Sequence, residues 1–197
     1  MFTGIIHELG TVARIAKARG VVRLEVSAPR TASRVQRLES IAINGVCLTV
    51  VDVREPLLVF EMIPETQRLT ALGTLRSGEA VHVEPSLSVT DRLGGHILFG
   101  HVDGLGTVTA RSQRAGELIV TVRVAPALRA FLVAKGPIAL DGVSLTVGTR
   151  LTSTTFRVHL IPETQRQTTL AQRPVGARLN VELDYLAKLV RHFLHRR

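Results

Sequence analysis

IPETQR occurs twice in this chain of 197 residues, first at residues 63–68 and again, unchanged, at residues 161–166. A second pair has nearly the same spacing, because NGVCLTV at 44–50 corresponds to DGVSLTV at 141–147. The spacing is 98 positions for the first pair (63 to 161) and 97 for the second (44 to 141). Such a period is too long for a solenoid unit and fits a whole small domain. The sequence therefore predicts two tandem copies of one domain.

Each copy has the residue pattern of β structure. Residues 22–26 alternate apolar and charged side chains, and the equivalent residues 120–124 alternate apolar and polar ones. Further β-branched and apolar runs follow, with Gly, Pro and Asp clusters between them at a spacing of about 8–12 residues, which predicts an all-β barrel or sandwich. Residues 29–38 and 126–134 each begin with proline, and we expect two short helices there.

Two segments lie outside the duplicated pattern. Residues 85–96 are rich in Pro, Ser and Gly and predict the boundary between the copies. The C-terminal end has the spacing of an amphipathic helix, which is too short to be stable without a surface to cover. Its apolar stripe consists of Leu186, Leu189, Val190, Phe193 and Leu194. We therefore expect an N-terminal barrel at 1–88, a C-terminal barrel at 97–184 and an oligomerisation helix at 185–197.

Composition limits the function classes. The only cysteine is Cys47, so the chain has no internal disulfide, which is typical of the reducing cytoplasm. No apolar run approaches the roughly 18 residues of a membrane span, and the N-terminus lacks a signal-peptide pattern. The net charge is +9, but the arginines are scattered and no basic stripe alternates with aromatics. We therefore expect a solvated basic surface and neither a nucleic-acid nor a membrane partner.

The differences between the two copies carry functional information. Cys47 in the first copy corresponds to Ser144 in the second, whereas Thr49 and Thr146 are the same in both. If the two ligand pockets were identical, there would be no reason for a thiol in one copy to correspond to a hydroxyl in the other. The divergence is expected if two like molecules bind in similar pockets but have different chemical roles.

Five stretches of the chain are long and specific: MFTGII, SIAINGVCLTV, GGHILFGHVDG, IALDGVSLTVG and IPETQRQTTL. In these stretches the chain resembles the riboflavin synthase family, and the likeness runs over nearly the whole sequence. The resemblance implies two tandem six-stranded Greek-key β-barrels and a C-terminal helix that joins three subunits into a homotrimer. It implies that two molecules of 6,7-dimethyl-8-ribityllumazine dismutate to riboflavin and 5-amino-6-ribitylaminouracil. No cofactor and no metal are implied.

The same resemblance implies that one site pairs the N-terminal barrel of a subunit with the C-terminal barrel of its neighbour. IPETQR would then occur twice because each barrel binds one substrate molecule. A non-catalytic lumazine or flavin carrier of the same fold is the alternative function. Both pockets keep their motifs, which favours the enzyme, since a carrier needs only one. The sequence leaves open whether lumazine synthase associates with the protein.

The resemblance assigns catalytic roles to Cys47, His101, Ser144, Thr146 and Asp141. An imidazole is suited to hydrogen bonding or proton transfer. Each of the others has a simpler alternative. Cysteine in a strand is often a small buried hydrophobe, and hydroxyls satisfy backbone groups at strand ends. The Asp–Gly pair is a common turn.

GGHILFGHVDG contains a second histidine, His96, five residues before His101. No carboxylate or cysteine ligand set converges on the pair, so a metal site is not predicted. We expect His96 to be structural. The family usually has a small serine before GHVDG, whereas this chain has Phe99, which either narrows the pocket or turns into the core.

The resemblance also places substrate contacts in the N-terminal segment, beside Cys47 and His101, and in both copies of IPETQR. Glutamate and threonine oxygens there can accept hydrogen bonds from ribityl hydroxyls, and main-chain groups can bind the pyrimidine edge. A repeated turn with a capping glutamate is the alternative. The expected substrate-binding residues are Phe2, Gly4, Ile5, Ile6, Leu48, Thr49, Glu61, Met62, Ile63, Pro64, Glu65, Thr66, Gly100, Val102, Lys135, Leu145, Ile161, Pro162, Glu163, Thr164, Gln165 and Arg166.

Overall fold

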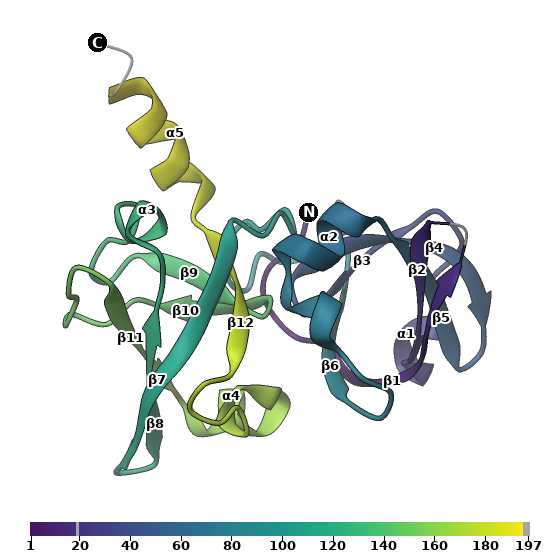
Figure 1. The fold of residues 1–197 in the computed structure, drawn as a ribbon, viewed down its shortest axis with the longest axis horizontal. Helices are drawn as coiled ribbons and strands as arrows, with labels where there is room; N and C mark the ends of the chain where they lie inside the picture. Colours follow the sequence, from purple (N-terminus) through teal and green to yellow (C-terminus); the bar gives the residue numbers. More distant parts are fainter. Residues whose placement is uncertain (19, 195–197) are drawn as a thin grey trace.

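The computed structural model describes residues 1–18 and 20–194, which form two β units side by side (Figure 1). The first unit is a closed barrel with the strand order β1-β2-β5-β4-β3-β6. Its strands are β1 (Glu8–Ala18), β2 (Val21–Ser27), β3 (Ser40–Ile43), β4 (Val46–Arg54), β5 (Leu57–Met62) and β6 (Ala80–Pro85). The short helices α1 (Pro29–Ala32), α2 (Pro64–Leu69) and η1 (Ala71–Thr74) connect them.

The second unit repeats this topology, with the order β10-β9-β12-β7-β8-β11. Its strands are β7 (Gly104–Arg114), β8 (Glu117–Arg123), β9 (Pro137–Leu140), β10 (Val143–Thr146), β11 (Thr155–Leu160) and β12 (Arg178–Leu183). The helices are α3 (Pro126–Arg129), α4 (Pro162–Gln167) and η2 (Thr169–Ala171). An isolated bridge between Val147 and Val158 joins the two ends of this sheet. The predicted all-β fold with two duplicated six-stranded Greek-key barrels is confirmed.

Each barrel encloses its own apolar core. Along β2 the side chains of Val22, Leu24 and Val26 point inward and are buried, while their neighbours face outward. Burying one such side chain completely contributes about 1.5–3 kcal/mol. The period-two pattern that predicted the strands therefore also marks the residues that stabilise the barrels.

The helices after β2 and β8 begin at proline, as predicted, but they are shorter than the predicted 29–38 and 126–134. They end at Ala32 and Arg129. Leu38 and Lys135 have φ values of 71° and 66°, which no α-helix accommodates. In both cases the residue's N–H donates at 2.8 Å to a barrel carbonyl, which is Val50 O in β4 or Val147 O directly after β10. The chain turns back to the barrel at these residues instead of extending the helix.

Two extended segments cross from one barrel to the other. We call residues 2–6 the first arm and residues 98–102 the second arm. Phe2 and Leu98 pair where the arms meet, with backbone N–H···O distances of 2.8 and 3.0 Å. Beyond this point Ile6 packs against the core of the second barrel, and Val102 packs against the core of the first.

Each arm continues the hydrogen bonding of the barrel that it reaches. Ser144 N donates to Gly4 O at 2.9 Å, and Cys47 N donates to Gly100 O at 3.0 Å. Both glycines have positive φ, and a Cβ on either would lie 2.6 Å from the Cβ of the facing Ser144 or Cys47. Only glycine fits both constraints. Since the arms are exchanged between the barrels, the bounds 1–88 and 97–184 stay a prediction.

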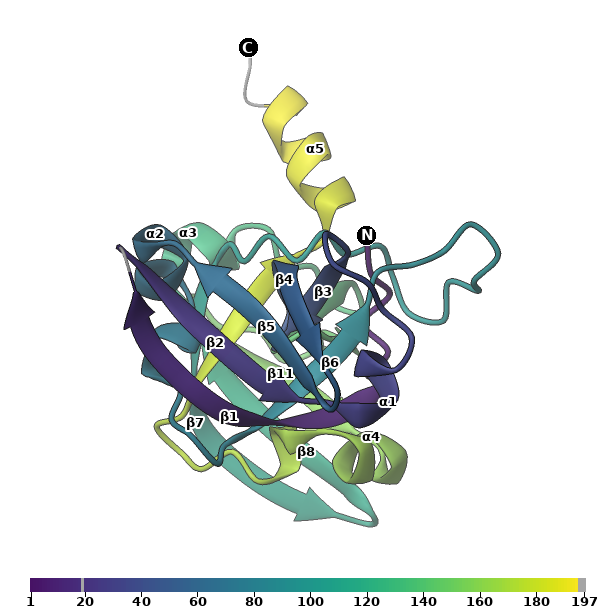
Figure 2. The same cartoon turned by 90° about the vertical axis from the view of Figure 1, so that its right-hand side faces the viewer.

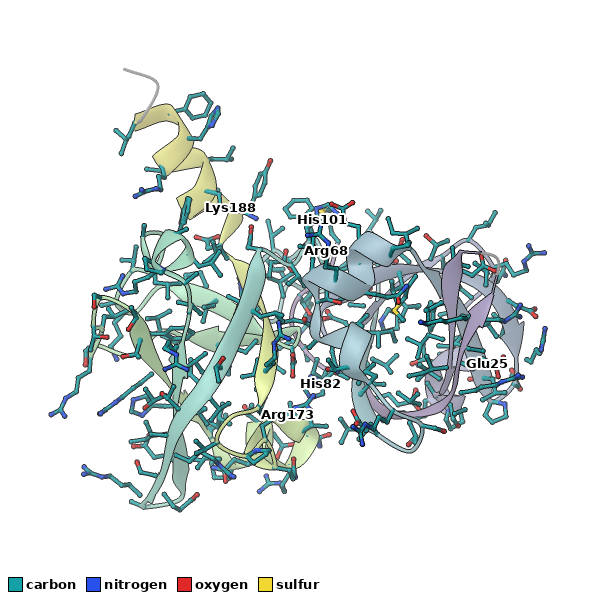
Figure 3. All side chains as sticks on the ribbon, in the orientation of Figure 1. Glu25, Arg68, His82, His101, Arg173 and Lys188 are labelled. Atoms are coloured by element: carbon teal, nitrogen blue, oxygen red, sulfur yellow. The ribbon has the colours of Figure 1, made fainter. Side chains whose placement is uncertain are left out.

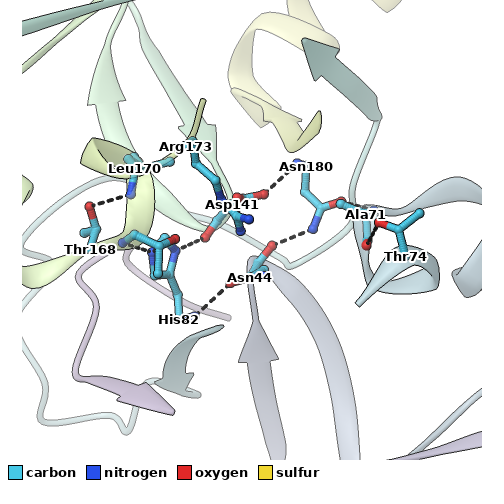
Figure 4. A network of polar contacts seen from close by, with 10 residues as sticks. Asn44, Ala71, Thr74, His82, Asp141, Thr168, Leu170, Arg173 and Asn180 are labelled. Carbon is cyan, nitrogen blue, oxygen red and sulfur yellow. Dashed lines mark hydrogen bonds and ion pairs between the residues drawn. The ribbon is translucent and has the colours of Figure 1, made fainter. Parts of the chain in front are cut away.

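The barrels also meet through a buried polar network between two equivalent turns (Figure 4). Asn180 Nδ2 donates to Asn44 O at 2.8 Å, and Asp141 Oδ1 accepts from Asn180 N at 2.7 Å. His82 of β6 is 2.7 Å from Asp141 O and 2.8 Å from Thr169 N. These bonds satisfy polar groups that would be costly to bury alone, and they join the two units.

Helix α5 (Tyr185–Leu194) projects away from both barrels (Figures 1 and 2). The predicted apolar stripe is present and largely uncovered, since Leu186 is 69 % and Phe193 64 % exposed. The last residues of the predicted helix, 195–197, lie outside the described part of the chain. Among the described residues there is no helix that is long and apolar enough to cross a membrane.

Candidate functional site

The first half-site lies on β4, where the second arm reaches it. Cys47 is half-buried and Thr49 exposed on the outward face, while Leu48 between them points into the core. β5 pairs with β4 only from Val50 onward, so the N–H of Cys47 binds the arm instead. The arm residue that Cys47 binds is Gly100, and the residue after it, His101, is exposed. The structure thus brings the predicted Cys47, Thr49 and His101 to one part of the first barrel.

The second half-site is the equivalent place on β10. Ser144 is half-buried and Thr146 exposed on the outward face, with the buried Leu145 between them. The first arm lies beside Ser144 and presents Ile5, which is 45 % exposed, at the position equivalent to His101. The same backbone frame therefore carries an imidazole in one half-site and an alkyl group in the other.

The second half-site contains a histidine that sequence reasoning assigned to structure alone. His96 Nδ1 lies 2.7 Å from Ser144 Oγ, and His96 N donates to Thr3 O at 3.1 Å. Burial lowers the pKa of His96, so the ring is neutral at pH 7 and can accept the Ser144 hydroxyl proton. The other ring nitrogen, Nε2, is buried and has no hydrogen-bond partner within the described residues.

A sequence signal for this arrangement existed in the glycines before His96. A Cβ on Gly95 would lie 2.2 Å from Thr3 O and 2.7 Å from Ser144 Cβ. Glycine is therefore needed for the backbone to pass this close to Ser144, and the following histidine is placed against the serine hydroxyl. The equivalent of His96 one repeat earlier lies before Met1, so comparison of the two copies gave no hint of it.

The two IPETQR segments form the beginnings of α2 and α4, each with proline in the first turn. Ile63 and Ile161, just before the prolines, are 53 % and 60 % exposed. Pro64, Glu65, Pro162 and Glu163 are also exposed, and Thr66 and Thr164 are half-buried. The repeated segment is thus the start of a short helix, which presents these residues at the ends of β5 and β11.

Two residues of the second copy have structural partners. Gln165 Nε2 donates to Leu160 O at 2.8 Å and to Gly116 O at 3.0 Å, which fixes α4 on the sheet. Glu163 is bonded to Arg166 and Gln167, and these contacts lower the pKa of its carboxyl group. Gln67 makes the equivalent contact with Met62 O in the first barrel. The repeated glutamine is therefore explained by the fold, without a ligand.

The structure does not bring Asp141 to either half-site. Its side chain has no exposed surface, and its carboxylate binds Asn180 N and the Arg173 guanidinium, the latter at 3.1 Å. Burial raises the pKa of this carboxyl to about 6. The residue occupies the turn with φ 45°, as Asn44 does in the first barrel. This buried place in the barrel junction fits the turn interpretation, and a catalytic role for Asp141 stays a prediction.

Several other predicted residues have buried side chains and can offer only backbone groups to a ligand. Phe2 is 1 % exposed and packs with Leu98, Ala42 and Ala139 in a small apolar core cluster. Lys135 is exposed at its left-handed turn, and Glu61 is exposed at the end of β5. The buried members of the predicted set are Phe2, Gly4, Leu48, Met62, Gly100 and Leu145, with Ile6 and Val102 half-buried.

Two buried carboxylates, which the sequence analysis missed, hold the arms. Glu84 Oε1 and Oε2 accept from Thr3 N at 2.6 Å and Gly4 N at 3.1 Å. Glu182 accepts from Phe99 N at 2.7 Å and Gly100 N at 3.0 Å. The two glutamates sit at equivalent places on β6 and β12, so the strand pattern VE, present in both copies, was their sequence signal. No group of three or more metal-ligating side chains exists among the described residues.

Comparisons with known proteins agree with this frame. The model of the lumazine binding domain matches twice, at residues 3–86 and 99–184. The riboflavin synthase of Bacillus subtilis is 36 % identical over 196 residues, covering 100 % of this chain and 91 % of the relative. The riboflavin synthase of Mycobacterium tuberculosis is 38 % identical over 197 residues, covering 98 % of both.

Solved structures show the same fold. LumP complexed with riboflavin matches with a TM-score of 0.85 at 23 % identity, covering 93 % of this chain and 99 % of LumP. LumP complexed with 6,7-dimethyl-8-(1'-D-ribityl) lumazine matches with a TM-score of 0.83. Fold and site thus define the class, a protein with two tandem lumazine-binding domains. Within that class, the chain belongs to the riboflavin synthase family.

Proposed function

We propose that this chain catalyses the dismutation of two 6,7-dimethyl-8-ribityllumazine molecules to riboflavin and 5-amino-6-ribitylaminouracil. The observation that carries the proposal is the pair of equivalent half-sites with different reactive groups. One presents Cys47 and His101, and the other presents Ser144 and His96. Two like molecules with unlike roles need such a pair. A carrier of one chromophore does not.

The transfer of four carbon atoms from one lumazine to the other needs no external oxidant. The two products together contain all the atoms of the two substrates, so one ring system is oxidised as the other is reduced. Alkylation at N8 already makes the C7 methyl group of the substrate acidic. The protein must therefore orient two ring systems and move protons, and orientation alone can supply about 7–11 kcal/mol of barrier reduction.

The residues have distinct proposed roles in this scheme. Neutral His96 accepts the proton of the Ser144 hydroxyl, which lies 2.7 Å away, and makes that oxygen a better acceptor towards substrate. His101 exchanges protons in the other half-site, with Cys47 beside it. Thr49 and Thr146 stand at equivalent exposed places and anchor the two rings. The exposed residues at the starts of α2 and α4 contact the ribityl chains.

We further propose that the working site forms between subunits of a homotrimer. The uncovered stripe of α5 supports this, since an apolar helix face of this kind is stable when a neighbour covers it. Association with lumazine synthase rests on the family resemblance alone. A cytoplasmic location fits the single reduced Cys47.

One assay tests the reaction. The purified chain is mixed with 6,7-dimethyl-8-ribityllumazine, without any added cofactor, and riboflavin is followed by its fluorescence. We expect one riboflavin to form for every two lumazines consumed. Binding of lumazine without any turnover would overturn the proposal and favour the carrier alternative. Absence of binding would exclude both.

A further inference from the structure

We propose that the base of the C-terminal helix positions His101, through Glu182, Tyr185 and Lys188 acting on the second arm. These three residues lie within one short stretch at the end of β12 and the start of α5. Figure 3 shows Lys188 near the start of α5 and His101 on the same side of the molecule. None of the three is part of the half-sites described above, so they are positioning residues and not catalytic ones.

The first contact fixes the backbone of the arm. The carboxylate of Glu182 accepts hydrogen bonds from Phe99 N and Gly100 N, the two residues that directly precede His101. Gly100 O in turn accepts from Cys47 N. The arm is therefore held on one side by the second barrel and on the other by the first. His101 directly follows Gly100, whose N–H and C=O are both hydrogen-bonded, so the backbone position of His101 is fixed.

The second contact fixes the side chain. The rings of Phe99 and His101 are stacked, with centroids 6.0 Å apart and an interplanar angle of 25°. The other neighbour of Phe99 is Tyr185, the first residue of α5, whose ring centroid lies 4.9 Å away at an angle of 57°. Aromatic pairs at such separations attract one another beyond simple burial. Phe99 thus connects the start of the helix to the imidazole.

The third contact fixes the C-terminal end of the second arm. Lys188 Nζ lies 2.9 Å and 3.1 Å from the two carboxylate oxygens of Asp103, which follows the arm directly. Asp103 Oδ2 also accepts from Leu183 N at 2.8 Å. The ammonium group lies 5.6 Å from the Tyr185 ring centroid, so the same helical turn carries both contacts. His101 is therefore flanked by two anchors to α5, at Phe99 and at Asp103.

The first arm is an internal comparison, because it has the carboxylate but not the helix. Glu84 binds Thr3 N and Gly4 N as Glu182 binds the second arm. Thr3 stands in the place of Phe99, and Ile5 in the place of His101, at the same spacing from the arm glycine. The aromatic and ionic contacts are thus added only to the arm that carries an imidazole. This selectivity indicates a role in placing that imidazole, beyond holding the barrels together.

The coupling has a consequence for the assembled protein. The stripe of α5 is exposed in a single chain, and in the proposed trimer a neighbouring subunit would cover it. A shift at the first turn of α5 moves Tyr185 and Lys188 together, and with them Phe99 and Asp103. We infer that His101 reaches its working position when α5 is docked.

The test compares two variants of α5, one in which a lysine and one in which an arginine is replaced by methionine. Lys188→Met removes the contact with Asp103, whereas Arg191→Met removes contacts with Ala130 O and the Phe131 ring, away from the arm. We expect Lys188→Met to lower kcat about fivefold, the equivalent of about 1 kcal/mol, with KM little changed. Arg191→Met should keep the kcat of the parent protein. Sedimentation must show the same assembly for both variants.

A second readout does not depend on turnover. The ring nitrogen signals of His101, identified by their loss in His101→Gln, are recorded by NMR in each variant. Tyr185→Leu and Lys188→Met should shift these signals, while Tyr185→Phe, which keeps the ring, should not. The kcat measurement rests on the proposed function, but the NMR measurement does not. A failure of this inference can therefore be distinguished from a failure of the proposed function. Unshifted His101 signals in both Tyr185→Leu and Lys188→Met would overturn the inference.

A double-mutant cycle tests whether Tyr185 acts through Phe99. In a Phe99→Ser background, Tyr185→Leu should have no further effect on kcat or on the His101 signals, because the connecting ring is gone. Equal effects of Tyr185→Leu in both backgrounds would show that the tyrosine acts by another route and would contradict the stacking argument.

Discussion

Cys47 and Ser144 occupy equivalent places on β4 and β10, half-buried and bonded through their N–H groups to an arm glycine. A thiol and a hydroxyl differ little in shape but strongly in acidity and nucleophilicity. Cys47→Ser should therefore keep the fold and lower kcat, by about tenfold if the thiol supplies about 1.4 kcal/mol to the transition state. Steady-state kinetics and a denaturation curve check this. Full activity with unchanged KM would show that Cys47 only packs against the cluster around Phe2.

His101→Gln keeps a hydrogen-bonding side chain but removes the imidazole. Because His101 is exposed and bonded neither to the core nor to the barrel junction, folding should be unaffected. General acid–base assistance is typically about 10²–10⁴-fold, so we expect kcat to fall by at least the lower figure. A change in KM alone would identify the imidazole as a uniform binding group and not a proton carrier.

His96→Ala removes the partner of the Ser144 hydroxyl and should lower kcat by about tenfold, which is less than the roughly 10²–10⁴-fold of a direct general base because His96 acts through Ser144. The matched control is His159→Ala, because His159 is an exposed histidine of β11 whose ring binds Glu117 at 2.9 Å. The control should retain parental kcat. If His96→Ala left kcat unchanged while Ser144→Ala lowered it, the serine would act without the histidine.

At this scale the sequence identified the reactive groups but not their partners. Cys47, Ser144 and His101 follow from comparison of the two copies and from the resemblance. The sequence could not place Asp141 in the barrel junction, because an Asp–Gly turn has the same letters whether it faces a pocket or a junction. The burial that distinguishes them depends on Asn180 and Arg173, which are remote in sequence.

At the scale of elements, the strands were predictable because their alternation of apolar and polar residues is a local property. The exchange of the arms was not, because it depends on which barrel each extended segment reaches. The sequence signal for this exchange is the pair Gly4 and Gly100, since only a glycine backbone can pass so close to Ser144 and Cys47. The short helices ended early for a similarly non-local reason, the backbone bonds of Leu38 and Lys135 to Val50 and Val147.

Deleting residues 186–197 should dissociate the proposed trimer and abolish or sharply lower the activity. Burying each apolar side chain of the α5 stripe contributes about 1.5–3 kcal/mol, which the deletion removes. The barrels should stay folded, because no residue of α5 belongs to either core cluster. Sedimentation and the turnover assay measure both effects. A truncated monomer with full activity would contradict the shared site, and a truncated trimer would assign assembly to the barrels.

At the scale of the whole molecule, two barrels are joined by crossed arms, paired glutamates and a buried polar junction. The centre of this junction is His82, whose side chain is 1 % exposed. Its Nε2 accepts from Thr169 N, so Nδ1 carries the proton and donates to Asp141 O. Protonation of Nε2 would place this second ring proton against the N–H of Thr169 and would break that hydrogen bond. Burial lowers the pKa of His82 from 6.5 to about 4, and burial raises the pKa of Asp141 from 3.8 to about 6.

These two shifts act on stability in opposite directions. The stabilisation linked to His82 is fully present above pH 6.5 and is lost as the pH falls through 4, since the unfolded chain then binds more protons. Moving a pKa from 6.5 to about 4 corresponds to about 3 kcal/mol. The stabilisation linked to Asp141 is fully present below pH 3.8 and is lost as the pH rises through 6. Between pH 4 and 6 the two contributions therefore oppose each other.

Substitution of one partner should expose the pH dependence of the other. Asp141→Asn fits the turn, because Asn44 has the same φ of 45° in the first barrel. This variant should lose more stability than the parent protein on acidification from pH 6 to 4, by up to about 3 kcal/mol. His82→Gln should show the reverse difference and lose stability, relative to the parent, as the pH rises over the same interval. Urea denaturation of the three proteins at pH 4, 5 and 6 measures these slopes. Parallel curves would show that neither group changes its pKa on folding and that the junction is insensitive to pH.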